Sequence, residues 1–345
     1  MKIEKKILGK VNKCYATSST VIDLDRKILL ATEGKGPCYM YSGPNFEQST
    51  VWDGPGGTMA IVAIPGKNGD FLAIQNFFPI YQSENAEIVW AQPQKGGKWN
   101  VKTILGLPYV HRFSILTAGG VNYFIGATLC TTKQFEDDWS DPGKIYIGII
   151  PDDLSKPIKL KVIKEGLTKN HGFCKTVWNE KMSIMVTCEE GVFVITPPQI
   201  QDGEWKIETV LEKSVSDIAV IDIDGDGEDE LVTIEPFHGG DFVINKKIGG
   251  QYKVVYKYPK EMDFGHVVWG GKLRGIPTII GGYRSLGKEL FYVQCVSTNP
   301  LKFKTEIIEA GTGPSNIDVL NGKDRDIIIA SNHGIDEAAL YFVTN

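Results

Sequence analysis

The sequence predicts an all-β protein of the seven-bladed β-propeller class, and three observations support this prediction. A unit of four short strands recurs seven times along the 345 residues. Glycine and asparagine turns separate the strands, and no segment shows the 3.6-residue hydrophobic period of an amphipathic helix. The last unit has three strands, and residues 2–11 have the pattern of the missing fourth. We therefore expect one domain over residues 1–345, a ring that the N-terminal strand closes by completing the last blade.

Each strand is recognised by its place in the repeat. The fourth strand carries lysines and β-branched residues and ends at a glycine or a turn, at residues 46–56, 99–108, 160–167, 205–214, 252–261 and 303–311. Two apolar strands joined by a turn follow, at residues 58–75, 111–128, 171–188, 217–234, 266–283 and 316–332, and a further pair begins near Ser18. A third apolar strand comes next, as at residues 87–93, 191–197 and 339–345.

Composition and charge exclude several classes of protein. The formal net charge is −5 and the charges are dispersed, so the chain has no basic field for nucleic acid or an anionic membrane. No apolar run is long enough for a membrane span or a secretory signal. The six cysteines have no CxxC spacing, which predicts reduced core thiols. We expect a cytoplasmic protein without nucleic-acid or membrane partners, and the sequence does not predict its oligomeric state.

An acidic loop in the fifth unit has the composition of a cation site. Asp222, Asp224, Asp226 and Glu230 alternate around two glycines, and such oxygen ligands on a tight bend suit Ca²⁺. The run resembles the calcium loop of FG-GAP (VCBS-like, integrin-α-type) repeats, with glutamate at the final position. This resemblance implies a structural calcium, and the alternative is a solvated, metal-free acidic turn. The loop joins the first and second strands of its blade.

All five histidines are predicted to lie on one face of the propeller. His111, His171 and His266 stand at the entry to the innermost strand of the third, fourth and sixth blades. His238 and His333 stand in the loops between the second and third strands of the fifth and seventh blades. Because strand direction alternates within a blade, both kinds of segment share a face. Imidazole is a frequent metal ligand and the usual acid–base group near neutral pH.

Other polar and aromatic side chains are expected on the same face. Arg112 and Asn170 adjoin entry histidines, Asn316 takes the entry position of the seventh blade, and Tyr283 and Arg284 are expected in a loop of the sixth. Two longer loops, 75–87 and 131–144, add the aromatic residues Phe77, Phe78, Tyr81 and Trp139. Aromatic rings beside polar groups suit the faces and hydroxyls of a sugar, although loop packing is the better explanation for any single ring.

This set of residues suits removal of a proton next to a carbonyl or carboxylate group, followed by loss of a β-oxygen. Such a reaction needs a positioned base, a general acid and a cation for the enolate-like charge. Architecture and residue set together resemble two groups of seven-bladed propellers, the polysaccharide lyases and the aldos-2-ulose dehydratase type. The resemblance implies β-elimination on a carbohydrate substrate that contains uronic acid or is a keto-sugar.

We assign hypothetical roles on this basis. His111, His171 and Tyr283 are the acid–base candidates, and a divalent metal (manganese, zinc or magnesium) is expected at His238, His266 and His333. The substrate-binding candidates are Arg112, Arg284, Asn170, Asn316 and Trp139. Two alternatives stay open: a non-catalytic propeller that binds a glycan or a protein, and a hydrolase or isomerase that uses the same residues.

Overall fold

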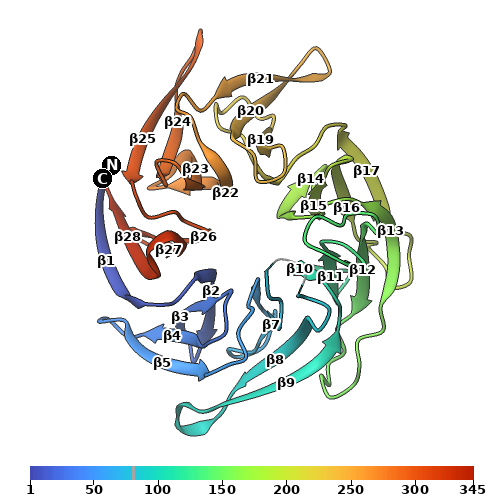
Figure 1. Cartoon of the computed structure of the whole chain (residues 1–345). Coiled ribbons are helices and arrows are strands. Elements are labelled where there is room, and N and C mark those ends of the chain that lie inside the picture. The colour runs from blue at the N-terminus through green and yellow to red at the C-terminus, as the bar shows by residue number, and fades with distance from the viewer. Residues whose placement is uncertain (80–81) are drawn as a thin grey trace. The chain divides into compact units, whose positions relative to one another are not determined.

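The structure is a computed structural model that describes residues 1–79 and 82–345. These residues form seven four-stranded antiparallel sheets, the blades of a seven-bladed β-propeller, so the predicted fold class and blade count are confirmed (Figure 1). The helical elements among them are two 3₁₀ turns, η1 (Lys95–Gly97) and η2 (His333–Ile335). No helix in the described part of the chain is long and apolar enough to cross a membrane.

Residues Tyr15–Glu212 form a compact unit that holds the first four blades, which we call the four-blade unit. Blades one and two consist of β2 (Cys14–Ile22), β3 (Asp25–Thr32), β4 (Cys38–Ser42), β5 (Glu47–Trp52), β6 (Ile61–Ala63), β7 (Phe71–Gln75), β8 (Glu87–Pro93) and β9 (Trp99–Gly106). Blades three and four consist of β10 (Val110–Ala118), β11 (Val121–Thr128), β12 (Gly143–Ile149), β13 (Lys161–Leu167), β14 (Gly172–Trp178), β15 (Lys181–Cys188), β16 (Gly191–Thr196) and β17 (Lys206–Leu211).

Residues Met1–Cys14 and Lys213–Asn345 form a second compact unit with the other three blades, the three-blade unit. Blades five and six consist of β18 (Asp217–Ile221), β19 (Glu230–Glu235), β20 (Asp241–Ile248), β21 (Gln251–Lys257), β22 (Asp263–Leu273), β23 (Ile276–Ser285), β24 (Leu290–Thr298) and β25 (Leu301–Glu309). Blade seven consists of β26 (Asn316–Leu320), β27 (Asp326–Asn332), β28 (Glu337–Thr344) and β1 (Lys2–Lys10). The single domain expected from the repeat stays a prediction.

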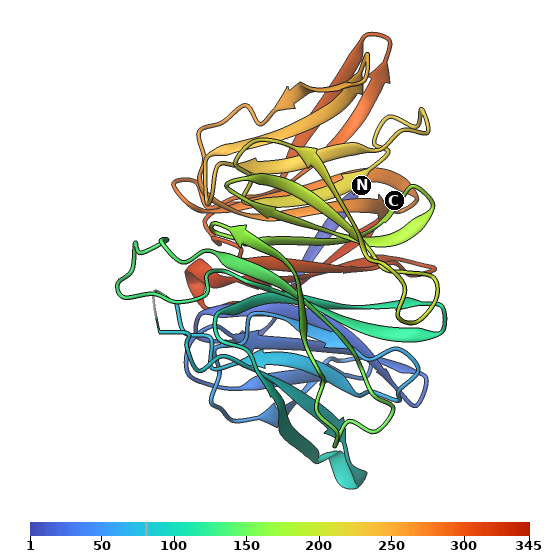
Figure 2. The same cartoon turned by 90° about the vertical axis from the view of Figure 1, so that its right-hand side faces the viewer.

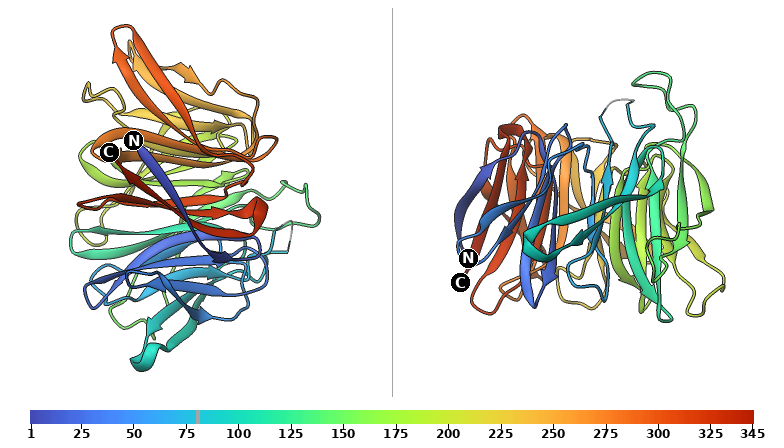
Figure 3. Two further views of the ribbon diagram at one scale, coloured as in Figure 1. Left: turned by 90° about the vertical axis from the view of Figure 1, so that its left-hand side faces the viewer. Right: turned by 90° about the horizontal axis from the view of Figure 1, so that it is seen from below.

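The N-terminal strand completes the last blade, as the repeat predicted. β1 pairs with β28 in antiparallel register from Lys2 opposite Thr344 to Lys10 opposite Glu337, with one irregularity. The left panel of Figure 3 shows β1 in blue beside the red C-terminal strands of its blade. The two chain ends therefore lie together, and β28 has a hydrogen-bonded neighbour on each side.

Burial follows the position of a strand within its blade. Every residue of β7 and of β16 is buried, because the middle strands of a blade pack on both faces. The outermost β1 has only exposed and half-buried residues. The first strand of blade one, β2, begins at Cys14, four residues before the expected start at Ser18. The apolar pattern of the sequence thus identified the strands well and their ends less well.

Candidate active site

Three entry histidines share one backbone arrangement. The residue two positions before each of them has a positive φ, which is uncommon for residues other than glycine. These residues are Tyr109 (57°), Lys169 (53°) and Phe264 (57°), before His111, His171 and His266 respectively. The same backbone conformation therefore precedes the entry histidine in blades three, four and six, which agrees with the register inferred from the sequence.

Two of these histidines lie at β-bulges. The register of β10 with β11 shifts between Val110 and Arg112, on either side of His111. The register of β22 with β23 shifts between Gly265 and Val267, on either side of His266. A bulge releases one residue from the ladder and redirects its side chain, a feature that is frequent next to active sites.

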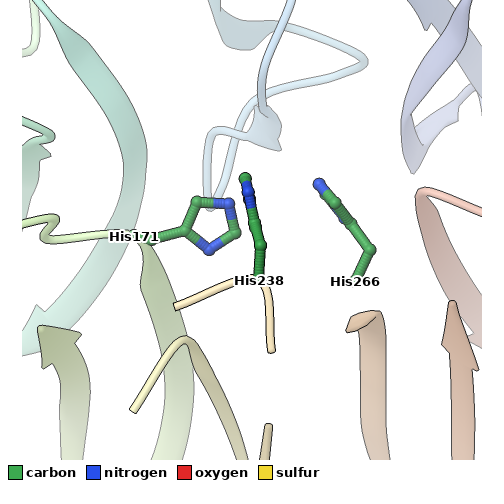
Figure 4. Close-up of side chains that lie close together, drawn as sticks. All are labelled: His171, His238 and His266. Atoms are coloured by element: carbon green, nitrogen blue, oxygen red, sulfur yellow. The ribbon is translucent and has the colours of Figure 1, made fainter. Parts of the chain in front are cut away.

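In the three-blade unit, His238 and His266 lie side by side between aromatic rings. Their ring centroids are 5.6 Å apart, and each offers a ligand nitrogen within 4.8 Å of the other's. Figure 4 shows these two rings facing one another, and it also labels His171, which belongs to the four-blade unit. His238, at φ 48° in the loop after β19, also stacks on Phe237 at 4.1 Å and on Phe264 at 4.2 Å.

The hydrogen bond of His266 determines which of its nitrogens can react. Its Nδ1 lies 2.6 Å from the carbonyl oxygen of Ser315, and the ring is 3% exposed. A carbonyl oxygen can only accept, so Nδ1 carries the hydrogen, and in the neutral ring Nε2 keeps its lone pair. A ring N–H donated to a backbone carbonyl is also the usual outer contact of a metal-binding histidine. His266 is thus prepared to act as a base or as a ligand.

His333 lies against an arginine. The Nη2 of Arg284 is 2.9 Å from both ring nitrogens of His333, and its guanidinium lies 5.0 Å from the centroid of the Phe264 ring. Arginine can only donate, so His333 accepts this bond through an unprotonated nitrogen, and the adjacent positive charge disfavours a bound cation. The geometry therefore favours His238 and His266 as ligands and does not favour the metal role expected for His333.

Tyr283 has a different environment from the one expected. Tyr283 and Arg284 belong to β23 and not to a loop, and Tyr283 is 1% exposed. Its hydroxyl donates to Glu289 at 2.6 Å, and the same carboxylate accepts from Tyr258 and Lys260. Burial and the Glu289 carboxylate raise the pKa of Tyr283 well above its usual range. This arrangement favours a structural role for Tyr283 over the acid–base role assigned from the sequence.

In the four-blade unit, His111 and His171 form a second histidine pair. Their ring centroids are 4.5 Å apart with planes tilted by 33°, and they are 4% and 2% exposed. Phe77 packs edge-on against His111 at 5.2 Å, and the hydroxyl of Tyr15 lies 3.5 Å from His111 Nε2. The structure thus brings together the two histidines that the sequence assigned to acid–base chemistry.

Two of the expected substrate-binding residues in this unit bind backbone carbonyls instead. Arg112 donates to the carbonyl oxygen of Met59 at 2.7 Å. The fully buried Asn170 donates to the carbonyl oxygens of Thr128 and Lys144. Both side chains therefore hold neighbouring segments in place. In the three-blade unit, the backbone N–H of Asn316 donates to the hydroxyl of Ser331.

The expected aromatic platform at Trp139 is covered by cations. The ammonium groups of Lys133 and Lys169 lie 3.4 Å and 5.5 Å from its ring centroid. Its loop, residues 129–142, extends beyond the strands of its own blade in Figure 2. Phe77 is buried and Phe78 is half-buried, whereas Tyr81 lies outside the described residues. Trp139 binds lysines where a sugar was expected to stack.

A lysine on strand β20, Lys246, lies against the carboxylates of the acidic loop. Asp222, Asp224 and Asp226 bring carboxylate oxygens within 4.8 Å of one another. The ammonium of Lys246 lies 3.0 Å from Asp224, 2.7 Å from Asp226 and 2.6 Å from Glu230, where a metal ion would sit. Burial alone would lower the pKa of Lys246, but its hydrogen bonds to these carboxylates raise it above its usual value. Calcium would fit only if Lys246 moved away.

The Lys246 contact leads to a prediction about calcium. Replacing Lys246 by methionine leaves the buried Glu230 carboxylate without its cation, so we expect a loss of about 3–5 kcal/mol in unfolding free energy. Calcium is expected to restore most of this loss in Lys246→Met and to change the wild type little, as followed by thermal unfolding with and without CaCl₂. Equal stabilisation of both proteins by calcium would show that the ammonium does not replace the metal.

Some residues that shape these groups were not singled out from the sequence. Ser315 acts through its carbonyl oxygen, and the sequence carries no signal for that contact. Lys246 could have been found, because the pairing of Leu231 with Asn245 places Glu230 directly opposite it on β20. Glu289 lies six residues after Tyr283, and the repeat pattern gives no reason to expect a contact between them.

Comparisons with known proteins support the fold and leave the function open. No protein-family model and no curated protein sequence matches the chain. The β-propeller domain of Cps50 (Swd1) from Myceliophteria thermophila matches 99% of this chain and 100% of its own length, with a TM-score of 0.62 and 8% identity.

Two sugar dehydrogenases match as well, both at 12% identity and a TM-score of 0.50. The PQQ-bound aldose sugar dehydrogenase from Streptomyces coelicolor covers 100% of this chain and 99% of its own, and the apo-form of the soluble aldose sugar dehydrogenase from Escherichia coli covers 99% of both. At such low identity these likenesses show a shared propeller fold alone.

Proposed function

We propose that this protein is a carbohydrate-active carbon–oxygen lyase or dehydratase. It removes a proton next to a carboxylate or carbonyl group of a uronic-acid-containing sugar or keto-sugar and eliminates the β-oxygen. The observation that carries the proposal is the placement of His266 at a β-bulge beside His238, with its Nδ1 donating to the Ser315 carbonyl. An imidazole held in one tautomer at a β-bulge is a positioned base or metal ligand.

The residues around His266 suit an acidic or carbonyl-bearing sugar. Arg284, over the Phe264 ring, supplies a permanent positive charge for a carboxylate, and an aromatic face can pack against the C–H face of a sugar ring. The His111–His171 pair keeps its proposed acid–base role, which its close packing in the four-blade unit supports. Tyr283 has no part in the proposal, because its hydroxyl is bound to Glu289.

A divalent metal is part of the proposal, with His238 and His266 as its ligands. Their nitrogens are close enough for one ion, and imidazole suits zinc, whereas calcium prefers oxygen ligands. When bound, such an ion would polarise the carbonyl or carboxylate oxygen of the substrate and so make the neighbouring proton more acidic. His266 would bind the ion through Nε2. The hydrogen bond from Nδ1 to the Ser315 carbonyl keeps the proton of the neutral ring on Nδ1, so Nε2 carries none.

Metal removal tests this proposal. After treatment with EDTA and gel filtration, we expect the ultraviolet absorbance of the unsaturated product to stop rising with polygalacturonate, alginate or a keto-sugar as substrate. Manganese or zinc should restore it. His333→Asn is the matched variant and should bind as much metal as the wild type by elemental analysis, because His333 is already bound to Arg284. Loss of metal in His333→Asn alone would contradict the ligand assignment.

The non-catalytic alternative gives a different result in the same experiment. A propeller that only binds a glycan or a protein would form no unsaturated product from any of these substrates, with or without metal. A hydrolase or isomerase would release reducing ends or an isomer without new ultraviolet absorbance. Cytoplasmic location and the absence of nucleic-acid and membrane partners stay predictions from the sequence.

A further inference from the structure

A pocket in blade four lies at the other end of β14 from His171. Its volume is about 350 Å³, within the range of small-ligand sites. It is formed by the end of β14, the start of β15, the loop between β16 and β17, and the start of β17. β14 begins directly after His171, and its seven residues span about 20 Å. The pocket is therefore separate from the His111–His171 pair.

The walls of this pocket are held in place by local structure. Asn179 and Glu180, both at positive φ, make the tight turn from β14 to β15. The loop after β16 is closed by a hydrogen bond from the Gly203 N–H to the carbonyl oxygen of Ile200. The neighbouring blade abuts it, since a Cβ on Gly119 would come within 2.3 Å of the Gln199 carbonyl oxygen. A ligand would meet a preformed site.

The chemistry of the lining selects for an uncharged, hydroxyl-rich ligand. The half-buried Trp178 and the 72% exposed Ile200 provide apolar surface. Around them the charges balance, with two lysines and two glutamates, and the amides of Asn179 and Gln199 both donate and accept. The charged lining residues are Lys181, Lys206, Glu204 and Glu208. Lys206 and Glu208 already neutralise each other at 3.0 Å.

We propose that this pocket binds a neutral sugar residue of an oligosaccharide. The C–H face of a pyranose packs on Trp178, and its hydroxyls bind the amides and charged groups at the rim. An acidic sugar would gain no net attraction from a balanced lining, and a purely apolar ligand would leave these polar groups without partners. The site is independent of the proposed lyase activity and would hold a glycan away from the histidines.

Calorimetric titration with neutral tetrasaccharides tests the proposal. With maltotetraose, cellotetraose and mannotetraose at up to about 10 mM, we expect saturable binding of at least one, weakened at least about tenfold by Trp178→Ala. Val177→Ala is the matched control, because Val177 precedes Trp178 on β14, is 52% exposed and does not line the pocket. Trp178→Phe keeps an aromatic face and should retain part of the affinity.

Three outcomes would overturn this proposal: no binding of any of the three sugars, unchanged binding in Trp178→Ala, or tighter binding of trigalacturonate than of the neutral sugars at this pocket. Circular dichroism and the unfolding midpoint of Trp178→Ala, compared with those of Val177→Ala, show whether the variant is folded. Product formation from a short substrate should be unchanged in Trp178→Ala, so failure here and failure of the proposed lyase activity are distinguishable.

Discussion

Replacing His266 by asparagine is expected to lower kcat for the proposed elimination by about 10²–10⁴-fold, because it removes a ligand of the metal ion, whose Lewis-acid effect is worth several kcal/mol. Asparagine can still donate from Nδ2 to the Ser315 carbonyl, as His266 does from Nδ1. It lacks a group at the position of Nε2, so the variant removes only the reactive nitrogen. We expect zinc or manganese content to fall as well, as measured by elemental analysis.

The matched variant for this experiment is His266→Gln, whose amide can reach the position of Nε2 but not that of Nδ1. It should lose the contact with the Ser315 carbonyl. Because that contact holds the side chain in place, we expect kcat of His266→Gln to be as low as that of His266→Asn. Wild-type activity in His266→Asn would exclude His266 as base and as ligand. Circular dichroism and the unfolding midpoint distinguish loss of chemistry from loss of fold.

Replacing Glu289 by alanine is expected to lower the free energy of unfolding by about 2–4 kcal/mol, the largest stability effect that we predict outside the acidic loop. Glu289 accepts from Tyr258 and Tyr283, which are 4% and 1% exposed. Without the carboxylate, both buried hydroxyls lose their acceptor and Lys260 loses its counter-ion. Urea denaturation measures this change.

Tyr283→Phe is the control for this experiment. It removes one donor and leaves Glu289 bound to Tyr258 and Lys260, so the loss of unfolding free energy should be less than about 1.5 kcal/mol. The same variant should keep its activity if Tyr283 is structural. Equal losses in Glu289→Ala and Tyr283→Phe would show that the carboxylate does not hold the cluster together.

The Glu289 carboxylate is expected to make the stability of the protein depend on pH. Burial alone would raise the pKa of Glu289, but its hydrogen bonds from Lys260, Tyr258 and Tyr283 lower it below the ordinary value of 4.5. A group whose pKa is lower in the folded state stabilises the protein at every pH above the pKa that it has in the unfolded chain. This contribution is lost as the pH falls through the pKa of the folded state. The stability advantage of wild type over Glu289→Gln should thus be constant above about pH 5.5 and shrink below pH 4.5.

The strands and their grouping into blades could be predicted from the sequence because their signal is local and repeated. A fourth strand such as β9 is recognised by its own residues, and β1 by its likeness to β25. The entry positions of His111, His171 and His266 follow from the same repeat, and the shared positive φ two residues earlier agrees with it. The exact start of β2, at Cys14, was missed because apolar residues continue before the recognised pattern.

The partners of the candidate site residues could not be predicted, because each lies far away in the chain or on the neighbouring strand. The Ser315 carbonyl that orients His266 is 49 residues downstream. Arg284 was expected to bind substrate and His333 to bind metal, but the structure places them against each other. In the acidic loop the carboxylates were visible in the sequence, whereas Lys246 reaches them from β20.

The amino-acid sequence by itself determined that this protein is a seven-bladed β-propeller whose last blade is completed by its first strand. A repeated alternation of apolar residues and turns suffices for this, since each blade buries the same faces in the same way. Only the tertiary structure decided which polar side chains remain available for chemistry. Hydrogen bonds across strands and loops fix the orientation of His266 and engage Tyr283 and Lys246 in structural contacts.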